Sequence, residues 1–379
     1  MSKKNIVENV PRYYETYVND CFATAYGAVL AHKGFNPNII LADYLSFMFD
    51  PKTEYYGTTY LYRFSTSVAF TEAELNTSLE FAYFAPTTYF SECENVGEVT
   101  KHKDRVHITM YIDDDPEVAA RRVEELVDSQ VPVAAVVDLY YMSYHRAYQN
   151  EHGLHAIVLT GYDNENQEYH LFDKYLLSSS DFDGVLPMQA IRDGRISDVP
   201  RNNPIIGEYR RPIRHLWMEF NADPSFEVTD EKVFALLRES YLRMSGQKGV
   251  FDYVTGIQAI EELRKSVLGY KEKPGDQAAA AYFKEYHNTC LKRVARSRQR
   301  FAVFIREVAD RLPQECVDIL LENVQESAKR WDIISNISLK FAITKAHRML
   351  DDMERNIQAI IEAESKVIEQ LELCTKTTV

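Results

Sequence analysis

A long apolar stripe near the C-terminus is the strongest constraint on how this 379-residue chain folds. Between residues 343 and 371, apolar side chains recur at alternating steps of three and four, and Glu364 is the one interruption. This spacing places them on one face of an α-helix. A comparable stripe runs from Val317 to Trp331. Because neither helix can bury its stripe alone, the pattern predicts a helical bundle within the chain, with a homodimer seam as an alternative that can coexist with it.

The distribution of Gly, Pro and aromatic residues divides the chain into two parts. These residues are concentrated before about residue 220, whereas the sequence from Phe226 onward is almost entirely helical in pattern. An Asp223-Pro224 step breaks the preceding pattern. We therefore predict a mixed domain over 1–222 and a helical domain over 223–379. The second would serve as a pocket wall, a dimer contact or both.

Composition excludes several classes of protein. A formal net charge of -14 argues against a nucleic-acid binder that depends on phosphate neutralisation. No apolar run is long enough to cross a bilayer, and the N-terminus lacks the apolar stretch of a secretory signal. Five scattered cysteines indicate neither a zinc site nor a disulfide framework. We expect a cytoplasmic protein without a metal, a membrane partner or a nucleic-acid partner.

The first domain shows the pattern of an antiparallel sheet flanked by helices. Two apolar segments predict buried strands over 131–137 and 155–160, and a turn at 163–166 precedes a returning strand over 168–172. A further strand is predicted over 209–220. Helices are predicted from about residue 21 to a stop at Gly34, over 41–49, and over 116–129 behind three aspartates.

Three distant residues offer the parts of a nucleophilic site. Cys21 stands where a helix begins, and helix starts acidify thiols. His155 opens one strand of the predicted hairpin and Asp173 closes the other, so antiparallel pairing brings them within hydrogen-bonding reach. If the first helix packs on that sheet, Cys21 faces His155. The imidazole would then take the thiol proton while the carboxylate orients the imidazole. The alternative is that Cys21 is a small buried apolar residue.

Other side chains are weaker candidates for the same site. The oxyanion of an acyl transfer needs hydrogen-bond donors, and the Cys21 backbone N–H and Asn19 are the candidates. Residues that follow the strand over 131–137 are candidates for substrate binding: Asp138, Tyr140, Tyr141 and Tyr144. Asp138 would pair with an ammonium group; alternatively it caps a turn and the tyrosines only pack. In the same loop, His145 and His152 are expected to face solvent.

The segments that contain these residues resemble a known family. Asp20 to Ala25, Val131 to Tyr144, and His152 to Asp173 are similar to butirosin biosynthesis protein H, and more distantly to bacteriocin-processing cysteine peptidases attached to transporters. The helix around Arg298 resembles the helical region that accompanies this family. The resemblance implies an α+β protein: a papain-like cysteine-peptidase fold with a central antiparallel sheet, followed by an all-α helical bundle domain.

The resemblance also implies a reaction. Members of the family take an aminoacyl group from the phosphopantetheine thioester of a carrier protein and pass it to an amine. Carried onto this chain, this assigns Cys21, His155 and Asp173 as the triad, needs no cofactor of the protein's own, and makes an acyl or peptidyl carrier protein and a small-molecule amine the partners. Papain-like peptidases place an oxyanion-hole Gln shortly before the nucleophile, whereas this chain has Glu15 and no Gln there.

A basic stretch in the second domain is a candidate docking surface for an acidic carrier protein. Its residues are Arg293, Arg296 and Arg300, with Lys292 and Arg298 beside them. The alternative is a solvated helix face. Two other functions stay open for the whole chain: a hydrolase, either thioesterase or peptidase, that uses the same triad, and a non-catalytic helical scaffold.

Overall fold

In the computed structural model, the described residues are 4–13, 21–52, 54, 56–58, 89–93, 104–175, 180–197, 202–203, 207–208, 214–249, 253–272, 283 and 288–376. The chain forms two compact units. The first unit comprises Met1–Leu41, Thr77–Asn203 and Glu208–Phe226; the second comprises Ala42–Asn76, Pro204–Gly207 and Glu227–Val379. The second unit thus includes Ala42–Asn76 from the N-terminal half of the chain. The distribution of Gly, Pro and aromatic residues does not predict this.

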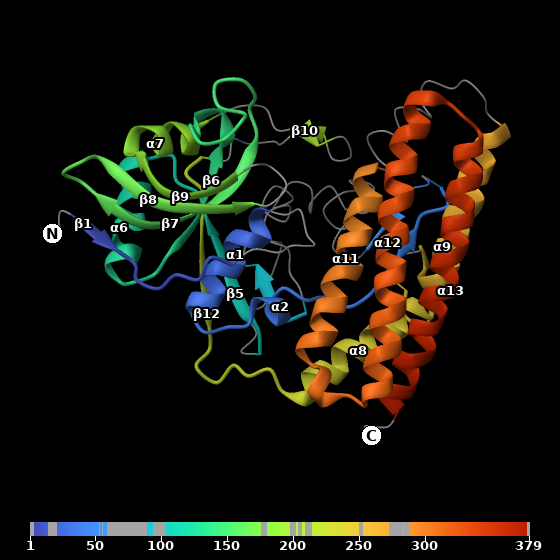
Figure 1. Cartoon of the computed structure of the whole chain (residues 1–379). Helices are drawn as coiled ribbons and strands as arrows, with labels where there is room; N and C mark the ends of the chain where they lie inside the picture. The colour runs from blue at the N-terminus through green and yellow to red at the C-terminus, as the bar shows by residue number, and fades with distance from the viewer. Residues whose placement is uncertain are drawn as a thin grey trace. The chain divides into compact units, whose positions relative to one another are not determined.

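A largely antiparallel sheet forms the first unit (Figure 1). Its order is β4-β5-β12-β6-β7-β8-β9, and β1 pairs with β7. Only the β4–β5 pairing is parallel among the described strands. The bounds are β1 Lys4–Ile6, β4 Ser91–Cys93, β5 Val106–Tyr111, β6 Val133–Asp138, β7 Leu154–Asp163, β8 Glu168–Tyr175, β9 Ser180–Pro187 and β12 Trp217–Ala222. Two short strands, β10 Asn202–Asn203 and β11 Gly207–Glu208, follow β9 in the chain.

The predicted hairpin is confirmed as β7 and β8, which pair Val158 with Phe172. Every residue of β6 is buried, as its apolar sequence predicts. A register shift between Leu159 and Gly161 bends β7. At Gly161 a Cβ atom would lie 2.8 Å from the Asn5 carbonyl oxygen, so glycine is what lets β1 approach β7.

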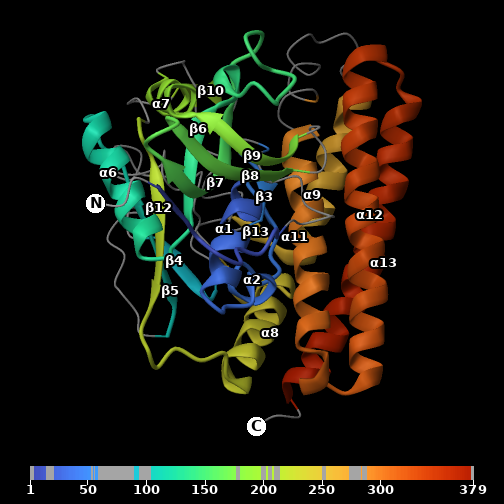
Figure 2. The ribbon, with the colours of Figure 1, turned by 60° about the vertical axis from the view of Figure 1, so that its left-hand side comes forward.

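Helices cover both faces of this sheet. Tyr26 of α1 (Cys21–His32) packs on Phe220, whereas Arg122 of α6 (Pro116–Asp128) pairs with the adjacent Glu219 of β12. Since neighbouring residues of a strand point to opposite faces, α1 and α6 lie on opposite sides of the sheet (Figure 2). The other helices that the structure describes in the first unit are α2 (Pro37–Ile40), the 3₁₀ turn η2 (Leu139–Tyr141) and α7 (Met188–Ile196).

Two local signals at helix ends are confirmed, and one predicted helix is wrong. Asp115 caps α6 by accepting from the Glu117 and Val118 amides, and α1 closes on Gly34, whose φ is +84°. The helix predicted over 41–49 is wrong. Met48 and Phe49 instead form β2, because pairing with β3 and β13 overrides the local apolar pattern.

The second unit combines a small sheet with a helical bundle. The sheet has the order β13 (Val254–Thr255), β2 (Met48–Phe49) and β3 (Tyr56–Gly57). Three long helices lie side by side (Figure 1): α11 (Asn288–Glu307), α12 (Gln314–Thr344) and α13 (Arg348–Lys376). Two shorter helices, α8 (Asp230–Met244) and α9 (Gly256–Gly269), pack against α13. The second unit also contains the 3₁₀ turns η3 (Tyr270–Glu272) and η5 (Ala309–Arg311). The predicted intramolecular bundle is therefore present.

The C-terminal stripe is shorter at its start than predicted. Ile343 lies in the last turn of α12 and is 71% exposed, because a left-handed turn at Lys345 separates the two helices. From Leu350 to Leu371 the stripe residues are buried.

Glu364, which interrupts this stripe, is buried in an ion pair. Its carboxylate accepts two hydrogen bonds from the Arg298 guanidinium, at 2.9 and 3.0 Å. The Ser327 hydroxyl and the Trp331 indole also donate to it, at 2.5 and 3.0 Å. Burial raises the pKa of Glu364. The charge of Arg298 and the hydrogen bonds from these donors outweigh burial, so the pKa of Glu364 lies below its ordinary value. The interruption is thus an internal polar contact of the bundle.

A disulfide joins Cys316 of α12 to Cys374 of α13, with Cα atoms 6.9 Å apart. The scattered spacing of the cysteines, which indicated no disulfide framework, does not predict this bond, since the α12–α13 hairpin brings together residues that are 58 positions apart. Cys21 and Cys290 are not disulfide-bonded. No helix within the described ranges is long and apolar enough to cross a membrane.

We predict that Glu364→Leu destabilises the second unit by about 3–5 kcal/mol, because the buried Arg298 loses its counter-ion. The double variant Arg298→Met/Glu364→Leu should recover most of this loss. The measurement is urea unfolding followed by Trp331 fluorescence in a Trp217→Phe background. Glu326→Leu, which removes an exposed i,i+4 pair with Arg330, is the control and should change stability by about 0.5 kcal/mol or less. Equal effects of Glu364→Leu and Glu326→Leu would contradict the assigned role.

Candidate active site

His155 and Asp173 meet on one face of the β7–β8 hairpin. Continuing the register from Val158 and Phe172 places Asp173 opposite Ile157, two residues from His155 on the same face. The His155 Nε2 atom lies 2.8 Å from Asp173 Oδ2. Their side chains are 3% and 2% exposed. A one-residue slip in register would separate them.

Cys21, the first residue of α1, completes this cluster. Its thiol, half-buried, makes a side-chain hydrogen bond with His155. Because Asp173 occupies Nε2, Nδ1 is the ring nitrogen that remains for the thiol. The structure thus brings Cys21, His155 and Asp173 together in the order thiol, imidazole, carboxylate.

The electrostatics of the cluster favour a charged imidazole. Burial is the largest influence on His155 and lowers its pKa. Cys21 and Asp173 act against it through their charges and hydrogen bonds, and together they raise the pKa of His155 from 6.5 to about 10. An imidazolium between two acidic groups has accepted the thiol proton and can pass it to a leaving group.

Tyr144 supports the carboxylate of this cluster. Its hydroxyl donates to Asp173 Oδ2 at 2.9 Å, and its ring stacks on Phe182 with centroids 4.3 Å apart. Burial and the charge of Asp173 raise the pKa of Tyr144 well above its usual range, so the hydroxyl keeps its proton. The sequence indicated Tyr144 as a substrate-binding candidate; its contact with Asp173 carries no signal in the sequence.

Asp138 is already occupied by protein donors. Its Oδ1 accepts from the Tyr140 and Gly153 amides, and its Oδ2 accepts from Ser197 Oγ at 2.6 Å and lies 2.8 Å from His152 Nδ1. Burial raises the pKa of Asp138, but these four partners bring it below its ordinary value. These are the contacts of a turn cap, and they leave no lone pair for a substrate ammonium group.

The other tyrosines of this loop stack near Asp138. Tyr140 lies parallel to the His152 ring at 4.2 Å, and Tyr141 meets Tyr140 edge to face at 5.2 Å. The His152 side chain is 39% exposed, as expected. His145 is not: it is 6% exposed, and its ring centre lies 6.2 Å from that of His155. The expectation that His145 faces solvent is therefore wrong.

The remaining candidates lie away from this cluster. Asn19, the candidate oxyanion donor, falls outside the described residues. The docking candidates Arg293, Arg296 and Arg300 are half-buried on α11, and each has interactions of its own. Arg298 between them is committed to Glu364. The described residues contain no group of three or more His, Cys, Asp or Glu side chains that could hold a metal ion.

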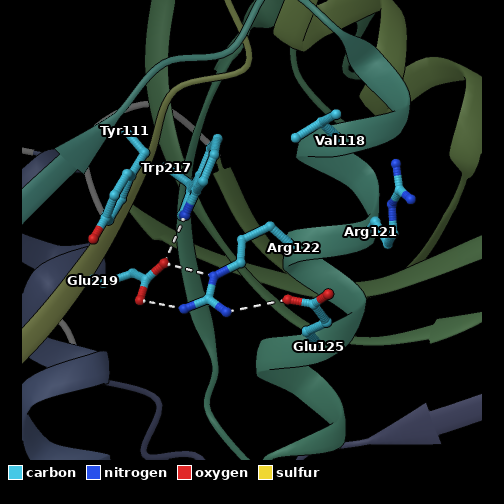
Figure 3. A pocket seen from close by; sticks show the side chains of 7 residues that line it. All are labelled: Tyr111, Val118, Arg121, Arg122, Glu125, Trp217 and Glu219. Carbon is cyan, nitrogen blue, oxygen red and sulfur yellow. Dashed lines mark hydrogen bonds and ion pairs between the residues drawn. The ribbon is translucent and has the colours of Figure 1, made fainter.

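A separate pocket lies between α6 and strands β5 and β12 (Figure 3). Its volume is about 320 Å³, and none of its lining residues belongs to the Cys21 cluster. Arg122 bridges Glu219 and Glu125 there, and the Trp217 indole donates to Glu219. Tyr111 stacks on Trp217, while Arg121 points away from the ion pairs. The carboxylates of this pocket are thus engaged by their neighbours.

We predict that Asp173→Asn lowers the pKa of His155 below about 10, because the variant removes a negative charge and a charge-assisted hydrogen bond. The titration of the His155 Cε1–H signal by NMR measures this shift. Since the folded pKa is raised, the stability contributed by His155 is complete below pH 6.5 and is lost as the pH rises through about 10. Asp181→Asn, on the exposed Asp181 of β9, is the control. An unchanged His155 titration in Asp173→Asn would contradict the electrostatic account.

Two comparisons with known proteins bear on this site. No curated protein matches the chain. The sequence model of the family described as butirosin biosynthesis protein H, N-terminal, matches residues 20–174. The matched stretch begins one residue before Cys21 and ends one residue after Asp173, so it includes the whole cluster. Residues 20–174, which contain the cluster, are therefore similar to the N-terminal domain of the butirosin biosynthesis protein H family.

Proposed function

We propose that the protein is a cysteine-dependent acyltransferase of natural-product biosynthesis, with a papain-like arrangement of helix and sheet. The observation that carries the proposal is the contact of His155 with both Cys21 and Asp173. The similarity of residues 20–174 to the butirosin biosynthesis protein H family supports a biosynthetic role. Cys21 is the nucleophile, His155 the general acid and base, and Asp173 the residue that orients the imidazole.

The first half-reaction loads the enzyme. The Cys21 thiolate attacks the carbonyl carbon of an acyl thioester carried on the phosphopantetheine of a carrier protein. A C–S bond to Cys21 forms, the C–S bond to phosphopantetheine breaks, and His155 gives its proton to the departing thiolate. The product is a Cys21 acyl-enzyme and a free phosphopantetheine thiol.

The second half-reaction transfers the acyl group. An amine attacks the Cys21 thioester while His155 takes the proton that the amine loses. The new C–N bond gives an amide, and the C–S bond breaks to restore the Cys21 thiolate beside the imidazolium. Asp173 holds the imidazole tautomer in both halves, and the Tyr144 hydroxyl fixes one oxygen of that carboxylate.

The general base of this proposal is shielded from bulk water in the structure. The His155 and Asp173 side chains are 3% and 2% exposed, so bulk water has little access to the base. A hydrolase with the same triad, a thioesterase or a peptidase, is the alternative, with water as the acceptor. Docking of an acidic carrier protein through Arg293, Arg296 and Arg300, the oxyanion role of Asn19, and a homodimer stay predictions.

We expect Cys21→Ala to abolish formation of product from an acyl-carrier thioester, because no other group can form the acyl-enzyme. His155→Ala should be nearly as damaging, and Asp173→Asn should impair the reaction less, because part of the geometry survives. The measurement is mass spectrometry of products with and without added amines. Amide formation supports the transferase, and free acid regardless of amine supports the hydrolase. Full activity of Cys21→Ala would exclude covalent catalysis at this residue.

Selective alkylation tests the activated thiol without knowledge of the substrate. Iodoacetamide should label Cys21 much faster than Cys290 near neutral pH, because His155 supports the thiolate and Cys290 is fully buried. Peptide mapping by mass spectrometry gives the two rates. In His155→Ala the rate at Cys21 should fall. Slow labelling of both thiols would favour the non-catalytic scaffold.

A further inference from the structure

His145 lies beside the cluster, in the loop between β6 and β7, and its ring centre is 6.2 Å from that of His155. The loop is closed at its ends by a hydrogen bond from the Leu139 amide to the Gly153 carbonyl. Within it, the His145 amide donates to the Met142 carbonyl, and the His145 carbonyl accepts from the Tyr148 amide. The backbone of His145 is therefore satisfied on both sides, and this fixes where its side chain begins.

The protonation state of the His145 ring follows from a backbone contact. The Ala147 amide donates to His145 Nδ1 at 3.1 Å. A backbone N–H is always a donor, so Nδ1 carries a lone pair and the single ring proton sits on Nε2. Burial, followed by the positive charge of His155, also lowers the pKa of His145. The residue is a neutral donor through Nε2.

This donor has no acceptor within the described part of the chain. The Nε2 atom is buried and unpaired, and His145 as a whole is 6% exposed. A buried N–H group without a partner disfavours folding, and native proteins leave few of them. An acceptor that arrives with the substrate explains why such a group is kept next to the cluster.

The proposed chemistry needs a donor of this kind. The acyl carbonyl oxygen becomes an oxyanion when Cys21 attacks, and a donor already in place lowers that barrier. The chain has Glu15 and no Gln shortly before the nucleophile, so the usual side-chain donor of papain-like peptidases is missing. A neutral imidazole can fill the role, as it does in other enzymes that polarise a carbonyl group.

We propose that the His145 Nε2–H group donates a hydrogen bond to the acyl carbonyl oxygen as it becomes the oxyanion. This inference rests on the proposed function, because it requires that an acyl group is loaded on Cys21. His145 exchanges no proton in the step; it only stabilises the developing charge. His155, whose ring centre lies 6.2 Å away, moves the proton.

Two reactions of the same thiol separate this role from a structural one. Acetyl transfer from S-acetyl-N-acetylcysteamine passes through an oxyanion, whereas alkylation by iodoacetamide displaces iodide and forms none. Intact-mass spectrometry of the full chain follows both at Cys21. His145→Leu should lower the acetylation rate about 100-fold and leave the alkylation rate unchanged. His145→Gln keeps an N–H donor and should recover part of the acetylation rate.

His170→Leu is the matched control. His170 also has a buried, unpaired Nε2, but it lies three residues before Asp173 and hence on the opposite face of β8. This variant should acetylate at the unaltered rate. Full acetylation in His145→Leu, or a parallel fall in both reactions in His145→Leu and His145→Gln, would overturn the inference. Absence of acetylation at Cys21 in the unaltered protein would instead overturn the proposed function, and the inference with it.

Discussion

The hydrogen bond between His155 and Asp173 is the contact on which the candidate site depends. A buried imidazole is normally neutral, because burial disfavours its charged form. Here Asp173 and Cys21 outweigh burial and raise the pKa of His155 to about 10. This raised pKa of His155 depends on Cys21 and Asp173 both lying within hydrogen-bonding distance of the imidazole. The β7–β8 register sets one of these distances, and the start of α1 sets the other.

The part of the site that lies on regular structure could be predicted from the sequence. Two apolar strands and the turn between them specify a hairpin, and antiparallel pairing then places His155 near Asp173 without any knowledge of the family. Cys21 is different. A helix start marks it as a candidate, but nothing in the sequence pattern says that α1 packs on this sheet; the resemblance to a family supplied that link.

Loop contacts lay beyond such prediction. Tyr144 and His145 are adjacent in a segment without a regular side-chain period, so their directions depend on turns that the sequence does not specify. Tyr144 donates to Asp173, and His145 is buried beside His155. Histidine in a polar loop is exposed more often than buried, which made the solvent-facing expectation for His145 reasonable and wrong. Turn capping by Asp138 rests on four donors, three from the β6–β7 loop and Ser197 after α7, that come together only in the folded protein.

In the helical second unit, too, the sequence pattern did not predict the contacts of a polar side chain. The apolar period specified the α12–α13 pairing, but Glu364 appeared in it as an interruption. In the structure Glu364 is one of the most tightly bonded residues of the bundle, because Arg298, Ser327 and Trp331 all donate to it. A single charge in an apolar stripe thus predicts a buried partner of opposite charge, since an unpaired charge is too costly to bury. The sequence could not say which arginine of α11 provides it.

Three residues of the chain from the end of β6 into the β6–β7 loop make different contacts at the site. Asp138 caps the start of this loop, Tyr144 holds the orienting carboxylate, and His145 presents an unused N–H group. The His155–Asp173 pair could form on the hairpin alone, but His155 has no N–H group left for a carbonyl oxygen once it is bonded on both ring nitrogens. That donor must therefore come from another residue. Because His145 is kept neutral by the Ala147 amide, it adds hydrogen-bonding capacity without adding a second positive charge that would oppose the His155 imidazolium.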